Sequence, residues 1–449
     1  MDLHAHIIIH MSNTSCPCQV KPPSSSPQPA AHSAIEHLVI DLFSGMDGAG
    51  VSAERVGVNT KAPNFFTIFY ESSQRCRALL RHHRMSDNAQ HELSDFTDAK
   101  GIQGSVMGVS TPEQIHKLIQ DFPNLKSVLI IGGSPCVGFS SAKTNRRGTF
   151  DEQSKLLAVF PVAVANIRQT VKASVIVFFV LENVSMNADE FVTSCGALIT
   201  KVMNVEPATI NCADFSGCHR ERSYWTNIQQ LPVQPRTVDP ANFLDQGWRP
   251  AWEFPSMEHR PDLRFGTFTR GFDIGHPPEV PDDVKSFPRL PLHAYSDRLM
   301  VVKQNLSDSE KTTVAKWMSS SVRISTQGIR DPGSPAMQAR SSLVKWIHQE
   351  DGHKLLRPLN GSERDRLLGF NPGASSLPDD PKNFFVLGQH QSTGNSFSIN
   401  AVSHVLQPWA TWINNSGTPP TTSGMPTITD FETAVAAIQP PASAGGRPH

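Results

Sequence analysis

The sequence lacks a long hydrophobic run. Its longest uninterrupted apolar stretch, Val175 to Leu181, has the length of a buried strand, whereas a helix that spans a membrane needs about 20 apolar residues. The three isoleucines at positions 7–9 have no Lys or Arg before them, although a secretory signal carries positive charge there. We therefore expect no membrane association and a chain that stays inside the cell.

Cysteine is scarce, and its spacing is not that of a metal site. The seven cysteines, at positions 16, 18, 76, 136, 195, 212 and 218, form an odd set without paired C-x-x-C motifs. Such a set predicts neither a disulfide framework nor a zinc ribbon, so no metal is expected. An excess of one charge is missing too, because 40 Lys and Arg stand against 41 Asp and Glu. Any binding of nucleic acid must therefore depend on local basic patches.

Two segments lack the apolar residues that a core needs. Residues 12–34 are rich in Ser, Pro and Gln, and residues 416–449 are rich in Pro, Thr, Ser and Gly. Burial in a chain of this composition does not offset the entropy lost on ordering. We expect a disordered leader over residues 1–35 and a disordered tail over residues 416–449. The overall apolar content of 38% is ample for a folded part from 36 to 415.

Within that part, apolar runs of strand length alternate with amphipathic stretches of helix length. The runs are Leu38–Ile40, Phe65–Tyr70, Val128–Ile131 and Val175–Leu181. Alternation of this kind is typical of an α/β fold, in which a mostly parallel, Rossmann-like sheet is covered by helices on both faces.

The pattern changes between residues 229 and 355. Eleven of the 60 residues from 232 to 291 are proline, which suits neither a helix interior nor a central strand. We predict a small irregular domain at 229–355, inserted into an α/β domain whose two parts are 36–228 and 356–415. In the returning part, Arg357–Phe370 and Ser398–Trp412 are predicted helices.

The first two apolar runs end in features of a cofactor site, because ligands of an open parallel sheet bind at the carboxyl ends of its strands. The first leads into a glycine-rich turn, Asp41 to Gly50, in which Asp47 is placed to cap the next helix. Glu71 follows the second run, where an acid reaches the hydroxyls of a bound ribose. These features favour an adenosine-containing cofactor, with a plain tight turn as the alternative. The negative charge of Asp47 disfavours a pyrophosphate and tolerates a sulfonium.

The third and fourth runs end in groups suited to catalysis. Gly132-Gly133-Ser134-Pro135-Cys136 removes two side chains before the cysteine and fixes the backbone with proline, so a substrate can approach closely. An isolated cysteine is most often a core residue, but this setting favours a nucleophile. Glu182 follows seven apolar residues. A carboxyl group there is strongly hydrogen-bonded, ion-paired, or raised in pKa as a proton donor requires.

Basic side chains gather around these motifs. Arg220, Arg222 and Tyr224 alternate, so a strand places them on one face. Two guanidinium groups there need a polar or anionic acceptor between them, and a solvated charged face is the alternative. The stretch after Cys136, from Val137 to Phe150, has the composition of a mobile basic lid.

The predicted insert interleaves basic and aromatic residues, as a nucleic-acid groove does, with an aromatic core as the alternative. The residues concerned are Arg236, Trp248, Arg249, Trp252, Arg260, Arg264, Phe265, Phe268, Arg270 and Phe272.

Taken in order, these motifs resemble those of the cytosine-5 DNA methyltransferases. The matching motifs are the cofactor loop Asp41–Gly50, the catalytic loop Gly133–Cys136, the acid motif Glu182–Val184, the arginine motif Arg220–Arg222, the supporting helix Arg357–Phe370 and the final motif Gly394–Phe397. The likeness covers about 36–228 and 356–412. Residues 145–148 and 219–225 look closest to the eukaryotic de novo branch.

The resemblance implies a covalent mechanism on a cytosine flipped out of double-stranded DNA, with S-adenosylmethionine as the methyl donor. It makes Cys136 the nucleophile, Glu182 the proton donor, and Arg222 with Arg220 the stabilising cations. It assigns the cofactor to Phe43, Ser44, Gly45, Gly48, Glu71, Ser105, Val106, Pro135, Leu156, Asn395, Ser396 and Phe397. It assigns DNA contacts to Lys143, Arg146, Arg147, Arg264 and Arg270.

Two positions depart from the family pattern. Asp47 stands where glycine is usual, and Ser105 stands where an acid usually binds the adenine amino group. Since Ser105 lacks that acceptor charge, Ser105→Asp is predicted to tighten the binding of S-adenosylmethionine, as calorimetry can measure.

Three other functions stay open. A small branch of the family methylates cytosine in transfer RNA with the same catalytic set. A silent regulatory paralogue is a second alternative, against which the intact Cys136, Glu182 and Arg222 count. An NAD-dependent dehydrogenase gives no role to Cys136. The expected location is the nucleus in a eukaryote and the cytoplasm otherwise, and the sequence specifies no chromatin or methyltransferase partner.

Overall fold

The computed structural model describes residues 33–85, 102–103, 106–136, 138–139, 147–187, 189–234, 236–260, 262–266, 299–321, 346–347, 350–380 and 387–439. The predicted leader lies outside these residues except for positions 33–35. Of the predicted site, Ser105, Lys143, Arg146 and Arg270 also lie outside them. No helix among the described residues has the length and hydropathy that a membrane crossing requires.

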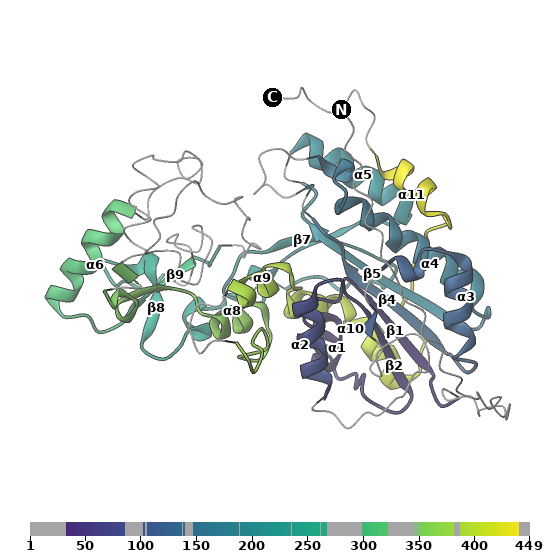
Figure 1. Ribbon diagram of the computed structural model, residues 1–449, viewed down its shortest axis with the longest axis horizontal. Helices are drawn as coiled ribbons and strands as arrows, with labels where there is room; N and C mark the ends of the chain where they lie inside the picture. The colour runs from purple at the N-terminus through teal and green to yellow at the C-terminus, as the bar shows by residue number, and fades with distance from the viewer. Residues whose placement is uncertain are drawn as a thin grey trace, which may run out of the picture. The chain divides into compact units, whose positions relative to one another are not determined.

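The central element is a seven-stranded sheet with the order β3-β2-β1-β4-β5-β7-β6 (Figure 1). Its strands are β1 (His37–Leu42), β2 (Phe65–Tyr70), β3 (Ile102–Gln103), β4 (Ser127–Gly133), β5 (Ile176–Val184), β6 (Ala208–Asn211) and β7 (Glu221–Thr226). The first five are parallel, and β7 runs antiparallel to both of its neighbours. The α/β prediction is confirmed, and all four predicted apolar runs are strands.

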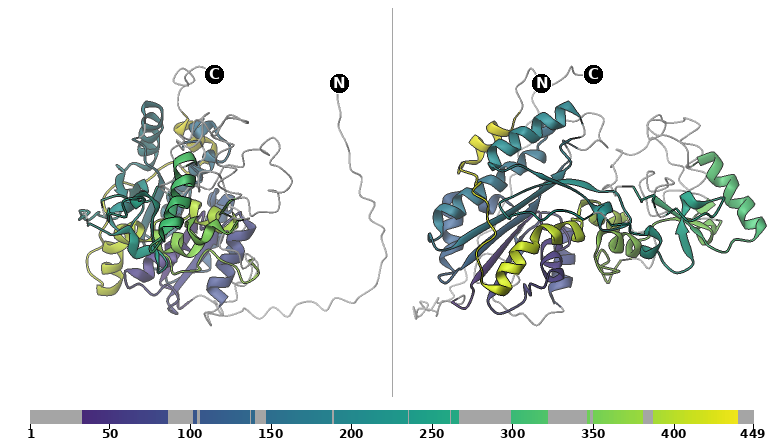
Figure 2. Two further views of the ribbon diagram at one scale, coloured as in Figure 1. Left: turned by 90° about the vertical axis from the view of Figure 1, so that its left-hand side faces the viewer. Right: turned by 180° about the vertical axis from the view of Figure 1, so that it is seen from behind.

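Helices cover both faces of the sheet (Figures 1 and 2). One face carries α3 (Pro112–Gln120), α4 (Val159–Thr170), α5 (Glu190–Met203) and α11 (Phe431–Ile438). The other carries α1 (Gly48–Arg55) and α10 (Ile399–Asn415), and α2 (Gln74–Met85) follows β2. Successive residues of one strand pack on opposite faces of the sheet: Ile40 packs against the first group of helices and Val39 against the second, as the period of two in a strand requires.

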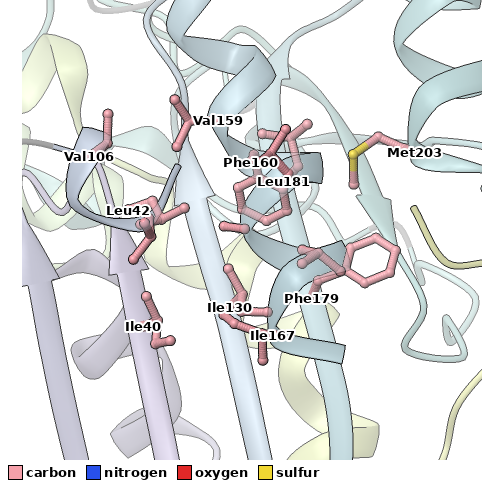
Figure 3. Close-up of a cluster of buried hydrophobic side chains, with 14 of the residues drawn as sticks. Ile40, Leu42, Val106, Ile130, Val159, Phe160, Ile167, Phe179, Leu181 and Met203 are labelled. Atoms are coloured by element: carbon pink, nitrogen blue, oxygen red, sulfur yellow. The ribbon is translucent and has the colours of Figure 1, made fainter. Parts of the chain in front are cut away.

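The larger core lies between β1, β4, β5 and the first helical layer (Figure 3). Ile130, Phe160 and Phe179 are completely buried there. Burying a side chain of this size stabilises the fold by roughly 1.5–3 kcal/mol. This packing fixes the strands whose carboxyl ends carry the predicted site residues.

A second, three-stranded sheet has the order β10-β9-β8. It consists of β8 (Trp248–Pro250), β9 (Met300–Lys303) and β10 (Leu356–Pro358), with α6 (Asp308–Ser321) packed against it through Val314. Its strands are antiparallel. Because β10 pairs with β9, this sheet extends just past the boundary predicted at 355.

The prediction of one helix over Arg357–Phe370 is only partly correct. Pro358 lies in β10, and α8 covers Gly361–Leu368. Asn360 accepts a hydrogen bond from the Glu363 amide while Glu363 accepts one from the Asn360 amide. This capping box fixes the start of the helix, and Gly369 at φ 90° ends it. A further helix, α9, covers Leu387–Asn395, and α10 confirms the second predicted helix.

The prediction of a disordered tail is wrong for residues 416–439, which we call the C-terminal arm. The arm contains α11, whose Ala434, Val435 and Ile438 are buried in the larger core. Asp430 caps this helix by accepting from the Thr433 amide at 2.7 Å. Composition misled here because six ordinary apolar residues in eight, Phe431 to Ile438, are enough for one amphipathic docking helix.

Candidate active site

The strands β1, β2, β4 and β5 end side by side. In the parallel register, Leu42 lies opposite Tyr70 and Gly132, and Gly133 lies opposite Glu182. The turn after β1, Glu71, Cys136 and Glu182 therefore share one edge of the sheet. Glu182 lies within β5, two residues before its end, and not after the strand as the sequence predicted.

The two glycines before Cys136 are required by close packing. A Cβ atom at Gly132 would lie 2.5 Å from the Leu42 carbonyl oxygen. One at Gly133 would lie 2.7 Å from Phe397 Cε1 and 2.8 Å from Glu182 Oε2. Contacts under 3.0 Å force a neighbour to move, so only glycine lets both the aromatic ring and the carboxyl group stand beside the strand end.

Cys136 is partly buried and lies in a field of three charges. Burial raises the pKa of its thiol, the positive charges of Arg222 and Arg220 act in the opposite direction, and the negative charge of Glu182 adds to the increase. The net direction is upward. The two cations expected to help ionise this thiol are present, but in the free protein burial outweighs them.

Glu182 and Arg222 form a buried ion pair. Arg222 Nε lies 2.9 Å from Glu182 Oε1, and about a tenth of each side chain is exposed. The antiparallel pairing of β5 with β7 places Val184 opposite Arg222. Of the possibilities open for Glu182 from the sequence, an ion pair is the one that the structure shows.

Arg220 is buried and oriented by the segment before α10. Its Nη2 donates to the Ser396 carbonyl oxygen at 2.6 Å, and both terminal nitrogens lie 3.4 Å from the Gly394 carbonyl oxygen. Burial lowers the pKa of Arg220, as does the nearby positive charge of Arg222. The two guanidinium groups are thus held by different acceptors, and a solvated charged face is excluded, because both side chains are buried.

Sequence reasoning missed one contact between neighbouring strand ends. Asn183 Nδ2 donates to Ser134 Oγ at 2.7 Å, and both residues are buried. Ser134 precedes Cys136 by two residues and Asn183 follows Glu182 directly, so this bond ties the cysteine segment to the end of β5. Both residues stood within quoted motifs, but a contact between them depends on the strand register.

The turn after β1 contains three residues with left-handed backbone conformations. Phe43, Gly45 and Asp47 have φ angles of 62°, 57° and 68°. Asp47 is the N-cap residue of α1, as predicted, but its side chain makes no capping hydrogen bond. Glu71 Oε2 accepts from the Gly45 amide at 2.8 Å, and Glu71 Oε1 from the Ser73 amide at 2.7 Å. Glu71, which directly follows β2, therefore also holds the turn after β1 in place.

Phe397 contacts both the start of α1 and the end of β4. A Cβ atom at Gly48 would lie 2.7 Å from Phe397 Cδ2, so the ring touches both Gly48 and Gly133. The other predicted cofactor residues are distributed as follows: Ser44, Val106 and Ser396 are buried, Pro135 and Leu156 are half-buried, and Asn395 is exposed. Val106 begins the turn η1 (Val106–Val109), and Leu156 lies in η3 (Ser154–Ala158).

Two of the predicted DNA-binding residues are described. Arg147 is exposed and directly precedes η2 (Gly148–Phe150). Arg264 is half-buried and donates from Nη1 to the Leu263 carbonyl oxygen. The neighbouring Phe265 is completely buried against Trp252, with ring centroids 4.6 Å apart. These two aromatic residues of the insert form a core, as the alternative from the sequence proposed.

The sheet order, with a single antiparallel strand between β5 and β6, together with a glycine-rich turn and a cysteine at the strand ends, defines an α/β fold of the methyltransferase type. The sequence model of the C-5 cytosine-specific DNA methylase family matches residues 38–408. The chain therefore belongs to this family, whose chemistry is methylation of cytosine at carbon-5. No curated protein sequence matches the chain.

Several solved structures are similar to it. A methyltransferase of Entamoeba histolytica, EhMeth, has 14% identity and a TM-score of 0.45, and the match covers 84% of this chain and 98% of that one. A triple-substituted DNMT2 of Spodoptera frugiperda has 12% identity and a TM-score of 0.45, with coverages of 83% and 99%. A putative DNA modification methyltransferase encoded within an Escherichia coli prophage has 16% identity and a TM-score of 0.42, with coverages of 85% and 100%.

Proposed function

We propose that the protein transfers a methyl group to carbon-5 of a cytosine flipped out of double-stranded DNA. The observation that carries this proposal is the grouping of Cys136, Glu182 and Arg222 at one edge of the sheet. The charges of Glu182 and Arg222 both act on the Cys136 thiol, and the two are themselves 2.9 Å apart. In a eukaryotic cell this activity belongs in the nucleus.

Cytosine carbon-5 is a weak nucleophile, so the ring must first be activated. In the proposed reaction the Cys136 thiolate adds to carbon-6, which makes carbon-5 electron-rich. Because burial raises the pKa of Cys136, the thiol has to lose its proton as the substrate binds. The two arginines are placed to favour that loss, since their positive charges stabilise the thiolate.

Glu182 and Arg222 act on the charge that this addition creates. Electron density moves to ring nitrogen 3 and oxygen 2 of the cytosine. We assign nitrogen 3 to Glu182, which accepts the proton that the Cys136 thiol loses and donates it to the ring, and oxygen 2 to Arg222 as hydrogen-bond donor. Loss of the carbon-5 proton to solvent expels Cys136 as the thiolate, and the return of the nitrogen 3 proton to Glu182 restores the ring.

The residues present fit S-adenosylmethionine, which supplies the methyl group when bound. The fit rests on the close packing of Phe397 at the strand ends, since a Cβ atom would lie 2.7 Å from this ring at Gly48 and at Gly133 alike. In the proposal the turn from Phe43 to Gly48 and Glu71 hold the nucleoside, and Val106, Pro135, Leu156 and the residues Asn395–Phe397 complete the walls. Ser105 belongs to this set by resemblance.

Duplex DNA is the proposed substrate because the chain carries a domain between the two parts of its catalytic domain. Arg357 of β10 is bound to Glu363 of α8 at 2.7 and 2.9 Å, and its guanidinium lies 4.1 Å from the Trp248 ring centroid. This buried connection fixes β8 and β10 to the catalytic domain. Arg147 and Arg264, with Lys143, Arg146 and Arg270, are proposed to contact phosphates.

Methylation assays with duplex DNA and with transfer RNA test the proposal. We expect incorporation into DNA, with 5-methylcytosine found by bisulfite sequencing, and none with Cys136→Ala. DNA containing 5-fluorocytosine should leave an adduct on Cys136. Methylation of transfer RNA alone would show that the substrate is RNA and not DNA. DNA methylation by Cys136→Ala would refute the covalent route.

A further inference from the structure

The C-terminal arm continues past the part of the chain that the family model matches, which ends at residue 408. It pairs with the chain directly after β7 and packs into the larger core. The Gln229 amide donates to the Pro420 carbonyl oxygen at 2.8 Å, and the Thr422 amide donates to the Asn227 carbonyl oxygen at 2.7 Å. Further along, Asn166 Nδ2 of α4 donates to the Thr429 carbonyl oxygen at 3.0 Å. The arm is therefore anchored along its length before α11 begins.

The arm reaches the catalytic segment at its far end. Thr149 Oγ1 donates to the Ile438 carbonyl oxygen at 2.8 Å, and both residues are completely buried. Ile438 is the last residue of α11, and its side chain packs in the larger core. The acceptor is thus a carbonyl group at a helix end, where it has no partner within the helix.

Thr149 is connected to Cys136 through two glycines. The Gly148 amide donates to the Gly138 carbonyl oxygen at 2.9 Å, and the Phe139 amide donates to the Cys136 carbonyl oxygen at 3.0 Å. A Cβ atom at Gly138 would lie 2.0 Å from the Gly148 carbonyl oxygen. The backbone two residues after Cys136 is therefore pressed directly against the residue before Thr149.

Ser154 supports the same point from η3. Its Oγ accepts from the Gly138 amide at 2.9 Å and lies 3.5 Å from the Pro135 carbonyl oxygen. The position of Gly138 is thus fixed from two sides, by Ser154 and by the Gly148–Thr149 segment. Of these two supports, only the second depends on the arm.

We propose that Thr149 is a positioning residue for Cys136, with the Ile438 carbonyl group of the arm as its fixed point. This inference rests on the proposed function, because it takes Cys136 as the nucleophile. A nucleophile has to be held within a fraction of an ångström of its attacking position, and a displacement of about 1 Å can cost on the order of 100-fold in rate. Loss of the Thr149 hydroxyl leaves the Ile438 carbonyl group without a partner. It also removes one of the two supports that fix Gly138 and, through it, Cys136.

The test compares Thr149→Val, Thr149→Ser and a control, Asn166→Ala, which removes a hydrogen bond from α4 to the same arm. We expect Thr149→Val to lower kcat about tenfold, the equivalent of one buried hydrogen bond, with KM for DNA and for cofactor within about twofold. Thr149→Ser keeps the hydroxyl and should recover most of kcat. Asn166→Ala should lower the Tm to a similar extent and leave kcat unchanged.

A second readout is independent of methylation: the rate at which iodoacetamide alkylates Cys136, followed by peptide mass spectrometry from pH 7 to 10. Thr149→Val should change this rate or its pH midpoint, whereas Asn166→Ala should not. Equal behaviour of the two variants in kcat and alkylation would overturn the inference. A wild-type protein that methylates nothing, but whose Cys136 alkylation depends on Thr149, would overturn the proposed function alone. If Thr149→Val does not fold, Thr149→Ala takes its place.

Discussion

Arg222 Nε and Glu182 Oε1 lie 2.9 Å apart, on neighbouring antiparallel strands and beside Cys136. The two charges act on the thiol in opposite directions, since Arg222 lowers the pKa of Cys136 and Glu182 raises it. Neutralising either partner therefore changes the ionisation of the nucleophile in a predictable direction. The effect of each charge on Cys136 can therefore be measured by alkylation of the thiol, without any substrate.

Glu182→Gln should lower the pKa of Cys136. The substitution removes a negative charge that opposes ionisation of the thiol. Alkylation of Cys136 at pH 8 should therefore become faster, by about tenfold for each unit by which the pKa falls. Methylation should fall on the order of 100-fold or more, because the proton donor is lost. Glu221→Gln, which changes an exposed carboxylate on the same strand as Arg222, is the control. Slower alkylation in Glu182→Gln would contradict the assigned sign.

Arg222→Leu should have the opposite effect on the thiol. It removes the strongest of the positive charges that favour the thiolate, so alkylation at pH 8 should slow. Methylation should fall by about 100- to 1,000-fold, as for loss of a group that stabilises developing charge. Arg222→Lys keeps the charge and should restore alkylation more completely than methylation, because lysine lacks the planar fork of donors. Equal recovery of both rates would argue against a directed hydrogen bond.

The strand ends were predictable from the sequence because each depends on residues close together in the chain. Val175–Leu181 is a continuous apolar run, and its strand follows from burial alone. The Glu182–Arg222 pair could not be predicted as a contact, since it depends on β7 turning antiparallel to β5. Residues brought together from distant parts of the chain were missed for the same reason, as with Asp245, which lies 2.6 Å from Arg366 and 2.7 Å from Asn360.

The C-terminal arm shows where composition fails as a guide. Proline, threonine and serine dominate its first residues, and they disfavour regular secondary structure. Their backbone groups are nevertheless satisfied by the edge of the described fold, as the Thr422–Asn227 bond shows. This segment is ordered by hydrogen bonds to residues far away in the sequence, and the composition of the segment itself does not predict them.

Gly133→Ala tests the close packing of Phe397 and Glu182 against the end of β4. The new methyl group would lie 2.7 Å from Phe397 Cε1 and 2.8 Å from Glu182 Oε2, and neither group can withdraw without disturbing the site. We expect loss of S-adenosylmethionine binding in calorimetry and loss of methylation of about 100-fold or more. Gly417→Ala is the matched control, because nothing lies within 4 Å of a Cβ atom there. Tight cofactor binding by Gly133→Ala would show that Phe397 does not form a wall of the cofactor site.

Asp365 should make stability depend on pH in the weakly acidic range. Burial raises the pKa of this carboxyl group to about 6, from an ordinary value of 3.8, against hydrogen bonds from the Gly373 and Ser375 amides to Oδ2. Because the pKa is raised in the folded state, its contribution to stability is complete below about pH 4 and is lost as pH rises through 6. The difference in pKa corresponds to about 3 kcal/mol.

Asp365→Asn removes this titration and keeps an oxygen that can accept from the two amides. The free energy of unfolding of wild type minus that of Asp365→Asn, measured by urea denaturation, should therefore decrease by up to about 3 kcal/mol between pH 4 and pH 7. Asp121→Asn, at an exposed carboxyl group, should show no such change. A difference that stays constant or increases with pH would mean that Asp365 is ionised throughout, with Arg364 beside it outweighing the burial of both side chains.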